Sequence, residues 1–300
     1  MPYQTLLKNF LQKPSDLPKC VVIYGPTACG KTAMSIDIAK TLGTEIISTD
    51  SRQIFRGMDI GTGKIREDEK EGIVHHMIDI VNPSQNYSVS EFKAEAEMHI
   101  SRLLNDDKIP LLVWGTGLYI DSLIYKSSIG SMPSDAELRK SFYMYSNEEL
   151  YARLEELDPE YARELHPNNR PYIERALEVK ILSGKSKKDF RSEKKLRYDT
   201  LFLTPYTWDR EALYNRINAR VKMMFDEGLE AEVRGLLKAW YTESDFGMKS
   251  IGYSEFFPYF AGKISLDEVQ NCIAQHSRNY AKRQISWFKK YHDQHAMENS

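Results

Sequence analysis

The chain has 300 residues, of which 41% are hydrophobic and 28% are charged, as in an ordinary globular protein of one large or two modest domains. Its net charge of −2 argues against a protein that binds nucleic acid over its whole surface. No apolar run approaches the roughly 18–20 residues of a membrane span, and the N-terminus lacks the apolar core of a signal peptide. Three widely spaced cysteines provide neither a disulfide framework nor a paired-cysteine zinc site. We therefore expect a cytoplasmic protein without a membrane partner.

The first part of the chain alternates short apolar runs with amphipathic segments. Residues 20–24 predict a strand that ends in a glycine-rich turn, and a helix begins at Lys31. A second strand at 46–47 ends near residues 48–51, and a capping box at 88–91 opens a helix that runs to about Asn105. Another buried strand covers residues 109–114. This alternation predicts an α/β fold, with a parallel sheet covered by helices on both faces.

The pattern becomes purely helical after about residue 126. Helices are predicted to start at Pro133–Ser134, at a capping box over 146–149, and over 171–182 before Gly184. A strand-like run returns at 199–204, Asp209 caps a helix that is broken at Gly228, and residues 265–268 cap a long last helix. We therefore expect a core formed by residues 1–127 and 199–300, with an all-helical insertion domain at 128–198.

Positive charge is concentrated in two tracts. Residues 180–197 contain eight Lys or Arg against two acids, and residues 276–290 contain five Lys or Arg and no acid. A single basic tract is usually a solvated face, but two of them in a net acidic chain favour a localised anionic partner. Aromatic residues adjoin the second tract, and this combination suits folded RNA.

Residues 25–32 match the phosphate-binding loop pattern GxxxxGK[ST] completely. Glycines let successive backbone N–H groups face one anion, and the helix that follows presents its positive end to the same anion. The pattern predicts a P-loop NTPase-like sheet and a diphosphate site, with Thr32 as a ligand of Mg²⁺. The site residues are Gly25, Pro26, Thr27, Ala28, Cys29, Gly30, Lys31 and Thr32.

The strand-end acid that organises Mg²⁺ in a typical NTPase is missing. The strand at 110–113 is followed by Trp114, Gly115 and Thr116, and Asp79 is only a weak substitute. Asp50 follows the second strand, at the edge where such sheets bind ligands, although an Asp there could equally cap a turn. Thr116 faces the same edge, or is a turn hydroxyl.

Arg216 and Arg220 are four residues apart on one predicted helix and share a face. A surface salt bridge is the default interpretation for either arginine, and Asp209 and Glu211 could pair with Arg216. An anion-binding role for these arginines is favoured only if this helix reaches the phosphate loop.

Together these residues resemble the tRNA dimethylallyltransferase family, also called tRNA isopentenyltransferases, of the bacterial type. The resemblance covers about residues 21–291. Besides the loop, it rests on Ser-Thr-Asp-Ser (48–51), Gly-Met-Asp-Ile-Gly-Thr (57–62), Gly-Thr-Gly-Leu-Tyr (115–119), Arg-Ala-Leu-Glu-Val (175–179), Gly-Leu-Glu-Ala-Glu-Val (228–233), Ile-Gly-Tyr (251–253) and Ala-Lys-Arg-Gln (281–284). It implies transfer of a dimethylallyl group from dimethylallyl diphosphate to the N6 amine of the adenosine 3′ of the tRNA anticodon, with release of diphosphate.

The resemblance also implies roles for matching residues. Asp50 would be the catalytic carboxylate, and Thr116 and Arg220 would stabilise the departing diphosphate together with Mg²⁺. The insertion domain would grip the anticodon stem-loop of tRNA, and the enzyme would act as a monomer without an obligate protein partner. The implied tRNA contacts are Asp50, Ser51, Arg52, Gln53, Arg139, Arg175, Lys249, Gly252, Tyr253, Lys282, Arg283 and Gln284.

Two other functions fit part of the pattern. A small-molecule or nucleotide kinase would keep the loop, Lys31 and the arginines, but it has no use for two basic tracts. A non-catalytic RNA-binding protein with a phosphate loop would not need Asp50 for its function.

Overall fold

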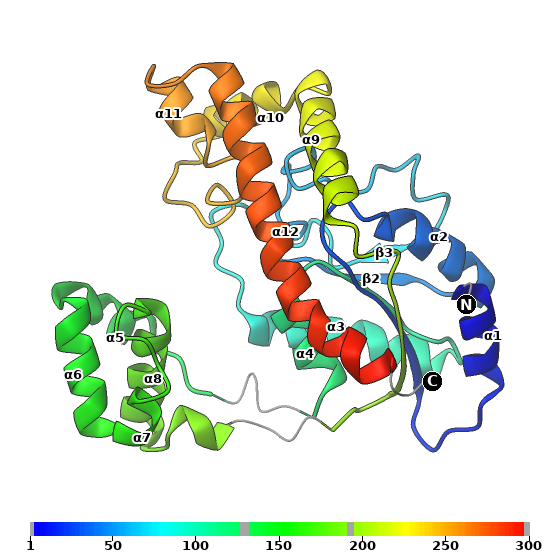
Figure 1. Ribbon diagram of the computed structural model, residues 1–300, viewed down its shortest axis with the longest axis horizontal. Coiled ribbons are helices and arrows are strands. Elements are labelled where there is room, and N and C mark those ends of the chain that lie inside the picture. Colours follow the sequence, from blue (N-terminus) through cyan, green and yellow to red (C-terminus); the bar gives the residue numbers. More distant parts are fainter. Residues whose placement is uncertain (1–2, 127–131, 191–194, 297–300) are drawn as a thin grey trace. The chain divides into compact units, whose positions relative to one another are not determined.

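The computed structural model describes residues 3–126, 132–190 and 195–296, except for the side chains of Trp114, Lys290 and residues 292–296. The chain divides into a core unit, residues 1–124 and 197–300, and an insertion unit, residues 125–196 (Figure 1). The boundary predicted at 127/128 and residues 191–194 of the first basic tract lie outside the described residues. No helix in the described ranges is both long and apolar enough to cross a bilayer.

The core unit is built on a five-stranded parallel sheet of order β3-β2-β4-β1-β5. Val21 of β1 pairs with Leu111 of β4 and with Leu201 of β5, while Ile46 of β2 pairs with Leu111 from the other side. The carboxyl ends of all strands therefore lie at one edge, which confirms the predicted parallel sheet. The strands are β1 (Lys19–Ile23), β2 (Ile46–Thr49), β3 (His75–His76), β4 (Leu111–Trp114) and β5 (Asp199–Leu203).

Helices cover both faces of this sheet, because the side chains of each strand alternate. On one face, α1 (Tyr3–Gln12) and α2 (Lys31–Leu42) pack over a cluster that contains Val21 and Ile23. On the other face, Tyr291 of α12 (Leu266–Ala296) stacks on Phe202 with ring centroids 5.4 Å apart. Helices α3 (Val89–Asn105) and α4 (Gly117–Ile124) pack together.

A second cluster joins α9 (Arg210–Asp226), α10 (Leu229–Lys238) and α11 (Phe256–Phe260) to the first half of α12. Figure 1 shows α9 and α12 side by side above the sheet. The predicted caps are confirmed: Asp209 Oδ1 accepts the N–H of Ala212, and the side chains of Ser88 and Ser265 accept the N–H groups of Glu91 and Glu268. These caps fix where the helices around the carboxyl edge begin.

Glu232 on α10 anchors the loop that follows β2. Its carboxylate accepts the backbone N–H groups of Asp59 (3.0 Å), Ile60 (2.8 Å) and Gly61 (3.2 Å). It also accepts the hydroxyl of Tyr253, at 2.6 Å. One charged acceptor therefore satisfies three successive backbone donors and a buried phenol.

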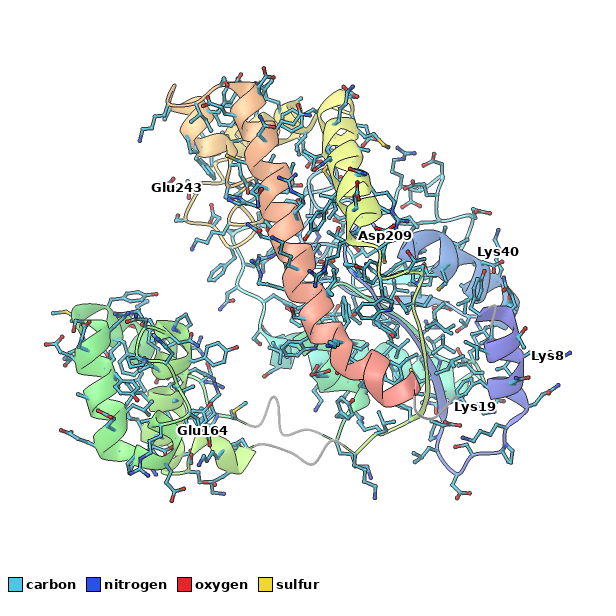
Figure 2. All side chains as sticks on the ribbon, in the orientation of Figure 1. Lys8, Lys19, Lys40, Glu164, Asp209 and Glu243 are labelled. Atoms are coloured by element: carbon cyan, nitrogen blue, oxygen red, sulfur yellow. The ribbon has the colours of Figure 1, made fainter. Side chains whose placement is uncertain are left out.

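We expect Glu232→Ala to lower the free energy of unfolding by about 3 kcal/mol, because these donors lose a charged acceptor at once. Urea unfolding at neutral pH measures the change. The exposed Glu243 provides the control (Figure 2), and Glu243→Gln should change the free energy by less than about 0.5 kcal/mol. Equal stability of the two variants would show that the loop does not depend on Glu232.

The insertion unit is entirely helical apart from one bridge between Tyr125 and Leu196 in its described part. Its core contains Phe142, Leu150, Leu154 and Ile173. The helices are α5 (Ala136–Ser141), α6 (Asn147–Leu157), α7 (Pro159–Ala162) and α8 (Arg170–Ser183), with 3-10 turns at Phe142–Met144 and Lys187–Phe190.

The first of these helices begins two residues later than the predicted start at Pro133–Ser134. The reason is that Asp135 is the N-cap: its Oδ1 accepts the N–H groups of Glu137 (2.8 Å) and Leu138 (3.0 Å). A carboxylate at this position also favours the positive end of the helix.

Candidate active site

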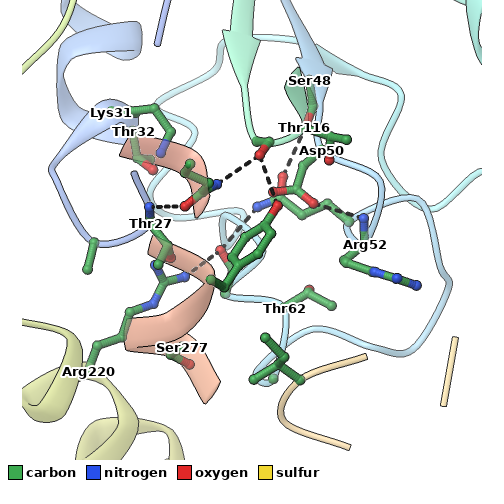
Figure 3. Close-up of a pocket in the computed structure, with 18 of the residues that line it drawn as sticks. Thr27, Lys31, Thr32, Ser48, Asp50, Arg52, Thr62, Thr116, Arg220 and Ser277 are labelled. Carbon is green, nitrogen blue, oxygen red and sulfur yellow. Dashed lines mark hydrogen bonds between the residues drawn. The ribbon is translucent and has the colours of Figure 1, made fainter. Parts of the chain in front are cut away.

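A cavity of about 730 Å³ opens at the carboxyl ends of β1, β2 and β4. Its wall includes the loop at 27–32, residues 50–53 after β2, and Gly115 and Thr116 after β4. Helices α9 and α12 close it with residues that include Arg220 and Tyr280. Figure 3 shows Lys31, Asp50, Thr116 and Arg220 gathered around this space from four separate elements.

The loop between β1 and α2 has the conformation of an anion cradle. Gly25 and Gly30 have φ of 146° and 100°, in the region that favours glycine. Gly30 is the N-cap of α2 and provides no side-chain cap, so the first N–H groups of the helix remain available to an anion. Lys31 Nζ donates to the carbonyl oxygens of Gly25 (2.9 Å) and Pro26 (2.8 Å), which holds the ammonium at the loop.

Arg220 brings a second cation to the same loop. Its guanidinium donates to Thr27 Oγ1 (3.4 Å) and to the carbonyl of Gly63 (3.2 Å). Burial lowers the pKa of both Arg220 and Lys31, while the nearby Asp50 acts in the opposite direction on each pKa. Helix α9 therefore does reach the loop. The surface salt-bridge interpretation is therefore wrong for Arg220, and Asp209, one of the two partners proposed for Arg216, caps the helix.

Asp50 stands directly after β2 and is half-buried. Its Oδ1 accepts the N–H of Arg52 at 2.8 Å, so the turn-cap interpretation holds for one oxygen. A Cβ atom at Gly115 would come within 2.0 Å of Oδ2, which shows how closely the carboxylate packs on that glycine. In the part of the chain that the structure describes, Oδ2 accepts no hydrogen bond, so this oxygen is available to a ligand.

Thr116 connects the ends of β2 and β4. Its Oγ1 accepts the N–H of Ser51 (3.1 Å) and donates to Ser51 Oγ (2.9 Å), while its own N–H bonds the carbonyl of Thr49 (3.0 Å). These bonds fix the backbone on both sides of Asp50. The sequence placed Thr116 at this edge, and the structure brings it beside Asp50 as expected.

Helix α12 supplies two buried polar side chains to the same edge. Gln284 Oε1 accepts the N–H of Thr27 and its Nε2 donates to the carbonyl of Gly115, both at 2.8 Å. The Tyr280 hydroxyl donates to the same carbonyl at 3.1 Å, and burial raises the pKa of Tyr280 to about 12. Tyr280 was not predicted as a site residue, because a hydrogen-bond partner 165 residues away leaves no local signal in the sequence.

The residues predicted to contact tRNA take different positions in the core unit. Arg52, Lys249 and Arg283 line the cavity, and Lys282 is exposed on α12. Gln53 also lines the cavity, and its side chain bonds Ser48 and the carbonyl of Gly63. By contrast, Gly252 and Tyr253 are buried.

Arg139 and Arg175, predicted as further tRNA contacts, meet at Glu178 in the insertion unit. Arg139 Nε donates to Glu178 Oε1 at 2.8 Å, and Arg175 Nη1 donates to Oε2. Burial acts to raise the pKa of Glu178, but bonds from the Asp135 N–H and the two guanidiniums hold it below its ordinary value. Both arginines therefore organise the insertion unit around a buried carboxylate.

Thr32, the predicted Mg²⁺ ligand, lies in the first turn of α2 on the cavity wall. The described residues contain no group of three or more His, Cys, Asp or Glu that could hold a metal ion. Asp79, the weak substitute for a strand-end acid, pairs with Lys64. The Thr32 hydroxyl fits Mg²⁺ only if a bound diphosphate supplies further oxygens.

Comparison with known proteins assigns the chain to a family. A family model described as IPP transferase matches residues 53–291, which is more than half of the chain. The chain belongs to the IPP transferase family. A second model, described as isopentenyl transferase, matches residues 18–86. This IPP transferase is 44% identical over 283 residues to a tRNA dimethylallyltransferase of Alkaliphilus oremlandii, which covers 92% of the chain and 90% of the relative.

Other relatives and solved structures agree. A tRNA dimethylallyltransferase of Bacillus anthracis is 43% identical over 277 residues, covering 90% of the chain and 88% of the relative. The crystal structure of a tRNA delta(2)-isopentenylpyrophosphate transferase from Staphylococcus epidermidis matches with a TM-score of 0.66 and 41% identity, over 91% of this chain and 90% of that one. A eukaryotic dimethylallyltransferase acting on tRNA matches with a TM-score of 0.81 and 30% identity, over 90% of this chain and 70% of that one. The comparisons support a prenyltransferase and not the kinase alternative.

Proposed function

We propose that this IPP transferase moves a dimethylallyl group from dimethylallyl diphosphate to the N6 amine of the adenosine 3′ of the tRNA anticodon. The observation that carries the proposal is that Asp50 lies across one cavity from the phosphate loop, where Lys31 and Arg220 of α9 are held. This arrangement provides a proton acceptor opposite a diphosphate cradle in a P-loop NTPase-like core. It also explains the missing strand-end acid, because no γ-phosphoryl group has to be activated.

The loop side of the cavity suits a leaving diphosphate. As the C–O bond to the prenyl group breaks, negative charge grows on the diphosphate. The free N–H groups of α2, Lys31 and Arg220 face that charge from fixed positions, and preorganised donors of this kind stabilise a transition state most. Mg²⁺ held by the diphosphate and the Thr32 hydroxyl would supply further positive charge.

The Asp50 side suits the acceptor amine. The N6 lone pair is delocalised into the adenine ring, so the amine is a weak nucleophile. As the N–C bond forms, an N6 proton becomes acidic, and Asp50 Oδ2 accepts it as a general base. The balance is complete: one N–C bond forms, one C–O bond breaks, and diphosphate and a proton leave. The adenine must leave its stack to reach the cavity, at a cost of a few kcal/mol.

The tRNA itself would be held by the basic residues at the cavity mouth and by the insertion unit. Arg52, Lys249 and Arg283 line the mouth, and Lys282 stands exposed beside them on α12. We further propose a monomeric enzyme, because all the groups used here come from one chain, and a cytoplasmic one, because its proposed substrate is tRNA.

A transfer assay tests the proposal. The purified protein is mixed with radiolabelled dimethylallyl diphosphate, Mg²⁺ and unmodified tRNA, and in parallel with labelled ATP. We expect label from the prenyl donor in tRNA and no phosphoryl transfer. Phosphoryl transfer from ATP without prenyl label in tRNA would identify the chain as a kinase.

We expect the double variant Lys282→Ala/Arg283→Ala to bind tRNA more weakly and with a salt dependence flatter by about two phosphate contacts. Its affinity for dimethylallyl diphosphate should change little. Filter binding of tRNA over a range of salt concentrations measures the affinity for tRNA and its salt dependence. The control is Lys8→Ala, an exposed lysine on α1 that does not line the cavity. Equal salt slopes for the double variant and the control would remove both residues from the tRNA site.

A further inference from the structure

The carboxamide of Gln284 connects the phosphate-loop side of the cavity to the side that holds Asp50. Its oxygen accepts the N–H of Thr27 in the phosphate loop, and its nitrogen donates to the carbonyl of Gly115 at the end of β4, both at 2.8 Å. The side chain is only 7% exposed, so neither bond is weakened by water. Thr27 lies 257 residues away from Gln284 in the chain, and Gly115 lies 169 residues away.

Each end of this bridge touches a group used in the proposed chemistry. On the loop side, Thr27 Oγ1 accepts a hydrogen bond from the Arg220 guanidinium. On the other side, the α-carbon of Gly115 packs so closely on Asp50 that a Cβ there would lie 2.0 Å from Oδ2. A shift of Gly115 would therefore shift the carboxylate, and a shift of Thr27 would disturb a donor to the diphosphate.

We propose that Gln284 is a positioning residue that fixes the phosphate loop relative to Asp50. It does not contact tRNA, contrary to what the family resemblance implies for it. The inference rests on the proposed function for its catalytic consequence, but the effect on the loop is independent of it. Small displacements of this kind, of about 1 Å, can lower a rate by about 10²-fold.

Glutamine suits this position because the bridge needs an acceptor at one end and a donor at the other. Methionine has nearly the same shape and provides neither. An ionised glutamate would place an acceptor against the Gly115 carbonyl, whereas a protonated glutamate restores the donor. Gln284→Glu should therefore regain function as the pH falls, and a residue that only fills space would show no such dependence.

The test compares Gln284→Met and Gln284→Glu with Gln275→Met. Gln275 is an exposed glutamine on the same helix that bonds only Asn279 and Arg278 in the described residues. Three quantities are measured: the Kd of inorganic diphosphate with Mg²⁺ by calorimetry, the Kd of unmodified tRNA, and the single-turnover rate of prenyl transfer. Thermal unfolding establishes that each variant is folded.

For Gln284→Met we expect diphosphate to bind about tenfold more weakly and prenyl transfer to slow by about 10²-fold, with the Kd of tRNA within about twofold of wild type. For Gln284→Glu the transfer rate, relative to wild type, should rise between about pH 8 and about pH 6. If Gln284→Met does not fold, the pH dependence of the glutamate variant decides whether Gln284 is a positioning residue.

Unchanged diphosphate affinity with a raised Kd of tRNA would overturn the inference and make Gln284 a tRNA contact. A glutamate variant with a flat relative pH profile would likewise contradict it. If the wild-type protein transfers no prenyl group, the proposed function fails, and the diphosphate Kd of the methionine variant still decides whether Gln284 positions the loop.

Discussion

Asp50→Asn is expected to slow prenyl transfer by about 10²–10⁴-fold, the range that a general base contributes. Asparagine keeps the shape of the side chain, and its Oδ1 can still accept the Arg52 N–H that Asp50 accepts at 2.8 Å. The turn after β2 should therefore survive while the proton acceptor is lost. Single-turnover transfer to unmodified tRNA measures the rate, and the Kd of tRNA should change by less than about twofold.

Asp267→Asn is the matched control, because Asp267 is an exposed residue in the first turn of α12. Its transfer rate should equal that of wild type. If Asp50→Asn and Asp50→Ala both kept the wild-type rate, Asp50 would have no part in the chemistry. A non-catalytic RNA-binding protein would keep its RNA binding in both variants.

Gly63→Ala is expected to lower the transfer rate by about 10²–10³-fold, as loss of one transition-state donor does. The reason is steric: a Cβ at Gly63 would lie 1.3 Å from Arg220 Nη2, so the guanidinium must leave the position from which it reaches Thr27. Arg220→Gln should show a similar loss. The double variant Gly63→Ala/Arg220→Gln should be no slower than Arg220→Gln, because both changes remove the same interaction.

Gly262→Ala separates this steric effect from backbone strain. Gly262 has φ of 70°, close to the 56° of Gly63, but a Cβ there would meet nothing within 4 Å. The control should lose about 1 kcal/mol of stability and keep the wild-type rate. If Gly63→Ala also kept that rate, the placement of Arg220 by the Gly63 carbonyl would not matter for transfer.

Local patterns were enough to predict much of the core unit. The phosphate loop, the strand before it and the caps at Ser88, Asp209 and Ser265 all depend on neighbouring residues, and the structure has the corresponding elements. Strand β3 was missed because two histidines, His75 and His76, carry no alternating apolar pattern. Helix α1 (Tyr3–Gln12) was not predicted either.

Roles that depend on distant partners were not accessible to pattern analysis. The family resemblance placed Gln284 and Tyr253 at a tRNA surface, but both are buried, and Tyr253 donates its hydroxyl to Glu232. Arg139 and Arg175 both pair with Glu178, which was not predicted from the sequence as a partner of either arginine. The contacts of Gln284, Tyr253 and Arg139 form only when separate elements pack together, whereas Arg175 and Glu178 are three residues apart on α8.

The most direct test of the central claim is the mass spectrum of tRNA nucleosides from a strain that lacks this chain. The strain is complemented with the wild-type gene or with Asp50→Asn. With wild type, the adenosine 3′ of the anticodon should carry an added five-carbon prenyl group on N6, and with Asp50→Asn the same adenosine should be unmodified. Unmodified adenosine in the strain that expresses the wild-type protein would contradict the account.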